Sequence, residues 1–398
     1  MWMVSLLSYI DRNTLAILAP VILRDTHLSA AQYGLILSCF SVAYTIGNPV
    51  WGLILDRVGV RRGMTAAVGM WTVASTAHAW ATGFWSFALA RAILGAGEGA
   101  TFPGGLRTVT RTLPPSKRGR GLAIAYSGGS LGAMVTPLIV TPVAAIFGWH
   151  GAFLFTGLLG ALWLVFWRIT ARGVDQTADL HPTADHLPLR QIATHPAFWA
   201  YMAAYGIGAL PLSFILYYSS LYLKARFGWS QNTLGMVLWI PPAGWELGYF
   251  IWGALLDGAT RRASGKDKLG PRDAPPFRGL MLATCLCSLP IALIHWLPTG
   301  PAVLAGMLVT MFGVSGFIVI SVAYATRSFP AGHAALLAGI GAGSWGAVSA
   351  LVLPWFGYLF DHSSYSTAFQ VAAVFPVVGY LLWRGLSIPH LRGNGSLA

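Results

Sequence analysis

The stretch GLILDRVGVRR fills residues 52–62, and a related stretch, GALLDGATRR, fills residues 253–262. Both carry Gly, Leu, Asp and a pair of Arg in the same order, and each follows an apolar segment long enough to cross a membrane. Such internal repeats are typical of membrane proteins built from two related halves, with a ligand site near the membrane midplane. The repeat therefore predicts an all-α integral membrane protein made of two six-helix bundles.

The composition supports a membrane location for nearly the whole chain. Of the 398 residues, 56% are hydrophobic and only 9% are charged, whereas a soluble domain has about 25% charged residues. The net charge of +13 would suggest nucleic acid in a soluble protein, but here a bias of Lys and Arg toward cytoplasmic loops explains it better. The first apolar stretch carries Asp11 and Arg12 in its middle, so we expect it to be the first span and not a cleavable signal peptide.

Windows of about 20 apolar residues predict twelve spans. The least distinct division is within 121–167, a stretch without Asp, Glu, Lys or Arg that we divide at the turn FGWH, residues 147–150. The predicted spans are 2–23, 33–55, 64–82, 85–106, 119–141, 150–170, 197–222, 233–256, 278–297, 302–325, 334–359 and 366–386.

The basic residues predict the orientation of these spans. Of the 25 Lys and Arg, 20 fall in the even-numbered gaps or the C-terminal tail, or within three residues of them at a span end. Only Arg24, Lys224 and Arg226 fall in the odd-numbered gaps, and Arg12 and Arg91 lie deeper within spans. Because Lys and Arg concentrate in cytoplasmic loops, we expect both termini to be cytoplasmic.

The longest polar connection, residues 171–195, divides the spans six and six. We therefore expect an N-terminal bundle over 1–170, a cytoplasmic linker over 171–195, and a C-terminal bundle with a short tail over 196–398.

Ionisable side chains inside spans are the first functional candidates, because an unpaired charge is costly in a bilayer. They are Asp11, Arg12, Arg91, Glu98 and Glu246. A purely structural alternative is that these charges pair to hold helices together. Neighbours on a helix point about 100° apart, so Asp11 and Arg12 cannot both face one partner. One should face the central cavity and the other a neighbouring helix. A guanidinium can donate two parallel hydrogen bonds to a carboxylate, which favours Arg12 as an anchor for an acidic ligand.

Polar and aromatic residues in other spans supply further ligand candidates. Tyr44 and Asn48 share one face of their helix; interhelical hydrogen bonding is the alternative. Tyr217 and Tyr218 could line a cavity, although some tyrosines of this span belong to the membrane interface. Trp345 follows a glycine-rich run over 339–343 and is a candidate cavity wall, unless the small residues serve packing alone.

Several motifs together resemble one branch of a known family. The loop stretch over 52–62 resembles the signature of the major facilitator superfamily. YIDRNTL at 9–15, AY at 43–44 and RAILGAGEGATFP at 91–103 resemble the anion:cation symporter branch, and within it the hexuronate and sugar-acid (galactonate-like) transporters. The resemblance covers nearly the whole chain, with a looser match in the second half. It implies proton-coupled uptake of a sugar acid across a prokaryotic inner membrane.

The resemblance also implies roles for individual residues. It places substrate contacts at Arg12 and Tyr44, and the proton-coupling carboxylates at Asp11 and Glu98, with Arg91 beside them. Glu246 is the third carboxylate of the predicted proton-coupling set. The charges agree with this coupling: three buried carboxylates and two guanidiniums sum to −1, and an added anion would make the interior −2. Burial disfavours the ionised form of a carboxylate, so uptake of a proton would offset the anion.

The repeated loop stretches are expected to gate the two states of a rocking bundle. The aspartate of each repeat lies at the end of a span. There its carboxylate can accept hydrogen bonds from an arginine or from a helix N-terminus. The predicted gating residues are Asp56, Arg57, Arg61, Arg62, Asp257 and Arg261.

Four alternative interpretations also fit the sequence. Sodium is the rival coupling ion, because Glu246 and carbonyls freed by Pro241 and Pro242 offer oxygen ligands. An exporter of amphipathic compounds, a non-transporting sensor and a membrane enzyme are further alternatives. No nucleophile motif, nucleotide loop or metal spacing indicates an enzyme, a cofactor or a metal site, and the three cysteines lie in apolar runs. We expect a monomer whose partners are a small organic anion, a proton or sodium ion, and the lipid bilayer, with no nucleic acid.

Overall fold

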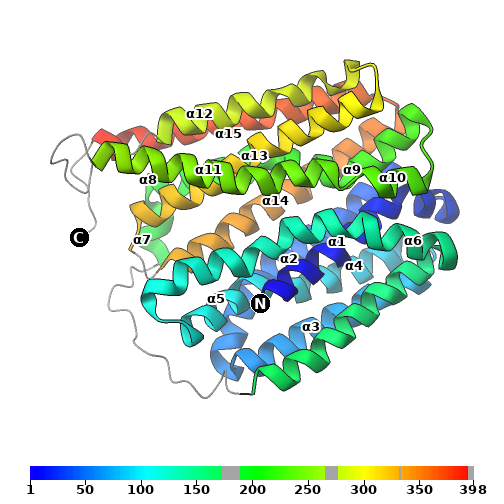
Figure 1. The fold of residues 1–398 in the computed structure, drawn as a ribbon, viewed down its shortest axis with the longest axis horizontal. Helices are drawn as coiled ribbons and strands as arrows, with labels where there is room; N and C mark the ends of the chain where they lie inside the picture. Colours follow the sequence, from blue (N-terminus) through cyan, green and yellow to red (C-terminus); the bar gives the residue numbers. More distant parts are fainter. Residues whose placement is uncertain (173–188, 265–276, 331–332, 393–398) are drawn as a thin grey trace. The chain divides into compact units, whose positions relative to one another are not determined.

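A computed structural model describes residues 1–172, 189–264, 277–330 and 333–392, and within these ranges the chain is helical without strands. Figure 1 shows long helices, many of which are joined by short connections within the described ranges. The first half contains α1 (Trp2–Thr26), α2 (Ala30–Val58), α3 (Val60–Ala77), η1 (His78–Trp80), α4 (Phe84–Glu98), α5 (Thr101–Thr112) and α6 (Pro115–Thr170). The second half contains α7 (Leu189–Thr194), α8 (Pro196–Met202), the π-helical η2 (Ala203–Gly208), α9 (Leu210–Phe227), α10 (Gln231–Val237), α11 (Ile240–Ser264), α12 (Phe277–Ser288), η3 (Leu289–Trp296), α13 (Gly300–Ser328), α14 (Ala334–Asp361) and α15 (Tyr365–Arg392).

Every predicted span has a helical counterpart, and the uncertain division within 121–167 is confirmed. Helix α6 covers two spans and is interrupted at Gly148, whose φ of 70° and ψ of 175° are not helical. A positive φ is accessible to glycine at little cost. The chain therefore turns back on this one residue, at the predicted FGWH turn.

Helix length and apolar character identify a multi-pass membrane protein. Eight helices of the described ranges are long and apolar enough to cross a membrane by themselves. Others cross in shorter pieces, as α4 and α5 do around a break at residues 99–100. Large apolar side chains such as Leu53, Val73, Leu89, Phe250 and Leu351 are exposed, and in a bilayer they face lipid.

Packing divides the chain into two compact units. Unit 1 comprises Met1–Pro182, Leu216–Pro242 and Gly346–Tyr365, and unit 2 comprises Thr183–Ile215, Ala243–Trp345 and Ser366–Ala398. Unit 1 thus takes in part of α9, all of α10, the first residues of α11 and part of α14 from the second half of the chain. The predicted bundles over 1–170 and 196–398 stay a prediction, and most of the predicted linker over 171–195 lies outside the described residues.

Inside unit 1, α1 packs on α6 and α2 packs on α4. The α2–α4 contact relies on glycines, as the Gly95/Gly99 spacing indicates. A Cβ on Gly95 would collide with the carbonyl oxygen of Phe40, and one on Gly99 would lie 2.7 Å from the carbonyl carbon of Gly47. Backbones that approach this closely bring the side chains of α4 next to those of α1 and α2.

Inside unit 2, α12 packs on α13, and α11 approaches α13 through Gly244 and Gly248. Pro241 and Pro242, which end a segment of unit 1, lie in the first turn of α11, after a two-residue interruption that follows α10. Proline is tolerated there because first-turn N–H groups have no helical partner. The break in this span therefore precedes the prolines.

Candidate functional site

The predicted charged residues of α1 lie in the core of unit 1. Asp11 and Arg12 are each 2% exposed, and their side chains contact different helices. Ser75 of α3 donates to Asp11 Oδ1 at 2.6 Å, and the Ser75 hydroxyl lies 3.0 Å from that of Thr156 on α6. Arg12 instead contacts α4. The expectation of separate partners for these two neighbours is confirmed.

Arg12 and Glu98 form an ion pair almost entirely removed from solvent. Arg12 Nε and Nη2 donate to the same oxygen, Glu98 Oε2, at 3.0 and 2.8 Å. The two side chains are 3% and 0% exposed. Glu98 Oε1 is buried and has no hydrogen-bond partner among the described residues. The carboxylate therefore retains acceptor capacity.

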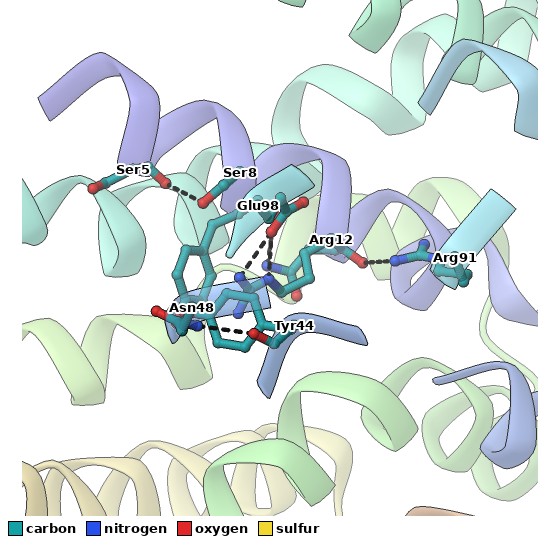
Figure 2. A network of polar contacts seen from close by, with 9 residues as sticks. Ser5, Ser8, Arg12, Tyr44, Asn48, Arg91 and Glu98 are labelled. Carbon is teal, nitrogen blue, oxygen red and sulfur yellow. Dashed lines mark hydrogen bonds and ion pairs between the residues drawn. The ribbon is translucent and has the colours of Figure 1, made fainter. Parts of the chain in front are cut away.

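Three aromatic rings surround the Arg12 guanidinium. Its central carbon lies 4.7 Å from the ring centroids of Tyr9, Phe40 and Tyr44 alike. Tyr9 comes from the preceding turn of α1, and Phe40 and Tyr44 stack on each other one turn apart on α2. Such contacts stabilise a cation by about 0.5–2 kcal/mol each. Figure 2 shows Arg12 between Glu98 and Tyr44 in this network.

Arg91 lies beside this pair, and its Nη1 hydrogen bond goes to the backbone of α1 and not to Glu98. Arg91 is 0% exposed, and its Nη1 donates to the carbonyl oxygen of Arg12 at 3.2 Å. Its Nε and Nη2 have no partner in the described parts of the chain. Two helical turns separate Arg91 from Glu98, an axial distance of about 10 Å. Helix packing places Arg12 at Glu98 instead.

The remaining predicted ligand contacts of unit 1 are buried and make hydrogen bonds of their own. Asn48 Nδ2 donates to the carbonyl oxygen of Tyr44 at 3.0 Å, and its Oδ1 has no partner among the described residues. The Tyr218 hydroxyl donates to the Leu353 carbonyl at 2.6 Å, and the Tyr217 carbonyl accepts from Tyr33 at 2.9 Å. Asn48 and the two tyrosines thus have structural contacts, and their predicted ligand role stays a prediction.

Trp345 and Glu246 belong to unit 2. Trp345 is 8% exposed, and its Nε1 has no partner in the described ranges. Glu246 is half-buried on α11. Arg12 belongs to unit 1, and the predicted roles of Trp345 and Glu246 stay predictions.

The predicted gate around Asp56 lies at the exposed end of α2. Asp56 pairs with Arg107 of α5, which confirms an arginine as its partner. Arg61 Nη2 donates to the carbonyl oxygen of Arg168 at 3.3 Å. Arg57, Arg62 and Asp257 are exposed, and the side chain of Arg261 lies outside the described residues.

Six residues whose side chains make these contacts were absent from the predicted set: Tyr9, Tyr33, Phe40, Ser75, Arg107 and Thr156. Phe40 precedes Tyr44 by one turn and Tyr9 precedes Arg12 by three residues, so helical spacing offered a signal for both. The other four are brought in by neighbouring helices, and local sequence carries no comparable signal for them. In the described ranges no three His, Cys, Asp or Glu gather as a metal site, and the three cysteines are free thiols.

Comparisons with known proteins agree with this architecture. A family model described as Major Facilitator Superfamily matches residues 1–351. A hexuronate transporter of Escherichia coli strain K12 is 27% identical over 63% of this chain, and the match spans 62% of that relative's length. A hexuronate transporter of Bacillus subtilis strain 168 is 28% identical, over 72% of this chain and 69% of the relative.

A solved structure shares the fold at greater sequence distance. It is a bacterial homolog of the human lysosomal transporter Spinster, in an inward-facing and occupied conformation. It superposes with a TM-score of 0.79 at 16% identity, over 100% of this chain and 97% of that one.

Proposed function

We propose that this chain, which belongs to the major facilitator superfamily, is a secondary active transporter that carries a small organic anion with protons by alternating access. The substrate class is a sugar acid, a hexuronate or an aldonate. The distant hexuronate transporters support this class, and the chemistry of the buried cluster supports it independently.

The proposal rests on one observation. The Arg12 guanidinium is enclosed by three aromatic rings and is paired with Glu98 through one of its edges. Its bonds to Glu98 use Nε and Nη2, and the Nη1 side is the part of the fork that a substrate carboxylate would engage. A planar fork suits a carboxylate because it can donate parallel hydrogen bonds. The tyrosine hydroxyls of the enclosure, on Tyr9 and Tyr44, are suited to the hydroxyl groups of a sugar acid.

The charge balance of the cluster supports proton coupling. Asp11 and Glu98 against Arg12 and Arg91 sum to zero when all four are ionised, and each of them is at most 2% exposed. A bound monoanion would leave this region at −1, which is unfavourable where the effective dielectric constant is low. One proton on Glu98 would restore neutrality and release Arg12 to the substrate. Glu246, half-buried in unit 2, does not enter this balance.

The deciding experiment is uptake into proteoliposomes with one gradient imposed at a time. Labelled glucuronate, galacturonate and galactonate are offered with an inward proton gradient at zero sodium, then with a sodium gradient at symmetric pH. We expect accumulation with the proton gradient alone. Accumulation that requires sodium would transfer the coupling to the rival ion, and no uptake of any sugar acid would refute the substrate class.

We further propose a cytoplasmic-membrane location with both termini inside. The distribution of Lys and Arg supports it. A membrane-impermeant thiol reagent added outside intact cells should label a cysteine introduced at position 226 and spare one at 190. The reverse pattern would invert the topology.

A further inference from the structure

Several helices of the described ranges contain a proline, and two of these prolines leave carbonyl oxygens that another helix reaches. Pro20 lies within α1 and Pro354 within α14. Proline has no N–H, so the carbonyl four residues earlier loses its helical hydrogen bond, at Ala16 and Ala350 respectively. In a bilayer such an unsatisfied group costs several kcal/mol. Each carbonyl therefore needs a donor from elsewhere.

A serine from another helix supplies that donor at both places. Ser220 of α9 donates to the Ala16 carbonyl. Ser38 of α2 donates to the Ala350 carbonyl at 2.7 Å and also lies 3.0 Å from the carbonyl of Gly34 on its own helix. All of these residues belong to unit 1. Each bond joins a helix of the first half of the chain to one of the second half.

A third contact of the same kind occurs at the start of α2. Asp361, the last residue of α14, accepts from the N–H groups of Ala30 and Ala31 at 2.7 and 2.9 Å. Ser29 caps only the next N–H, that of Gln32. A carboxylate is stabilised at a helix N-terminus by the helix dipole. The first turn of α2 is thus completed by a residue more than 300 positions away.

Small residues allow α2 and α14 to approach along their length. A Cβ on Gly357 would collide with the carbonyl oxygen of Ala30, and one on Gly34 would lie 2.6 Å from that of Leu353. This contact therefore extends over several turns and includes both the Asp361 and the Ser38 bonds.

We propose that the bonds Ser220–Ala16, Ser38–Ala350 and Asp361 to the first turn of α2 are a latch that holds one end of the transporter closed. By the predicted topology it is the outer end. Opening removes the partners of two carbonyls and two N–H groups, so water must enter and replace them. The latch therefore couples opening to hydration of this end, and it rests on the alternating access proposed above.

Double electron–electron resonance tests the latch without any substrate. Nitroxide labels at positions 27 and 363, exposed and adjacent to the two ends of the contact, report the open and closed populations in a background lacking native cysteines. We expect Ser38→Ala and Ser220→Ala each to raise the open-to-closed ratio about fivefold, about 1 kcal/mol. Asp361→Ala should raise it about tenfold.

Matched variants separate the latch from general loosening. Ser41 is also buried on α2, but its hydroxyl donates to Leu37 of its own helix at 3.0 Å, so Ser41→Ala should leave the ratio unchanged. The Asp25 carboxylate pairs with its sequence neighbour Arg24. Asp25→Ala is therefore the control for Asp361→Ala. If the latch variants match these controls, the proposal is refuted; should Asp361→Ala not fold, Asp361→Asn decides in its place. A protein that carried no sugar acid could still show the shift in the open-to-closed ratio. Failure of the substrate proposal is therefore distinguishable from failure of the latch.

Discussion

Arg12–Glu98 and Arg107–Asp56 are both arginine–carboxylate pairs, but they lie in opposite surroundings. The first pair is 3% and 0% exposed, and the second is 23% and 48% exposed. Removing one partner of a buried pair costs about 3–5 kcal/mol because the other charge is left unpaired, whereas an exposed pair contributes about 0–1 kcal/mol. The difference indicates that a change of protonation or ligand at Arg12–Glu98 can drive a transition between the two access states. A change at Asp56–Arg107 can only shift the ratio of those states.

The largest expected effect is that of Glu98→Gln, which mimics the protonated carboxyl group. This variant should bind substrate and exchange it across the membrane, but it should lose all accumulation driven by a proton gradient. Counterflow and gradient-driven uptake in proteoliposomes separate the two activities. Asp56→Asn is the matched amide substitution and should still accumulate substrate; full accumulation by Glu98→Gln would exclude Glu98 from coupling.

The next effect concerns stability. Arg12→Ala leaves Glu98 buried without its partner and should lower the free energy of unfolding by about 3–5 kcal/mol. Arg107→Ala should lower it by at most about 1 kcal/mol. Unfolding in denaturing detergent, followed by circular dichroism, measures both. Equal losses would mean that burial does not separate the two pairs.

A smaller effect is expected when the charge is kept and the planar fork is lost. Arg12→Lys should weaken sugar-acid binding at least about tenfold, or about 1.4 kcal/mol. Arg107→Lys should bind as the wild type does. Tryptophan-fluorescence titration or calorimetry gives both affinities, and wild-type affinity in Arg12→Lys would remove Arg12 as the anchor.

The smallest effect is expected at the exposed pair. Asp56→Asn should change the ratio of the two access states by about threefold, the effect of less than 1 kcal/mol, and leave the ranking of competing sugar acids as it is. Competition uptake assays measure that ranking. A changed ranking would place Asp56 in the substrate site and end the contrast between the two pairs.

The sequence was sufficient to predict features that depend on one helix at a time. Apolar length predicted the spans, and the polar turn around Gly148 located the division of α6. The angle between consecutive helical residues predicted that Asp11 and Arg12 have different partners, which their bonds to Ser75 and Glu98 confirm.

Features that depend on how helices cross were not predictable in the same way. Arg91 and Glu98 share a stripe of α4, yet Glu98 binds Arg12 and Arg91 binds a backbone carbonyl. Which pairs form depends on the close approach of α2 and α4 at Gly95 and Gly99, a three-dimensional register that spacing along one helix does not contain. The same limit explains why Ser75 and Arg107 were missed.

The turn at Gly148 also fixes the direction in which each following side chain of α6 points around the helix axis. Thr156, the residue that shares a hydrogen bond with Ser75 beside Asp11, lies eight residues, a little over two turns, beyond that joint. Losing one residue between them would rotate everything downstream by about 100° and shift it by about 1.5 Å along the axis. The Thr156 hydroxyl would then point away from Ser75. A change of length in this short segment would therefore displace Thr156 from Ser75, whereas a substitution at an exposed position such as His150 or Leu154 would leave that rotation unchanged.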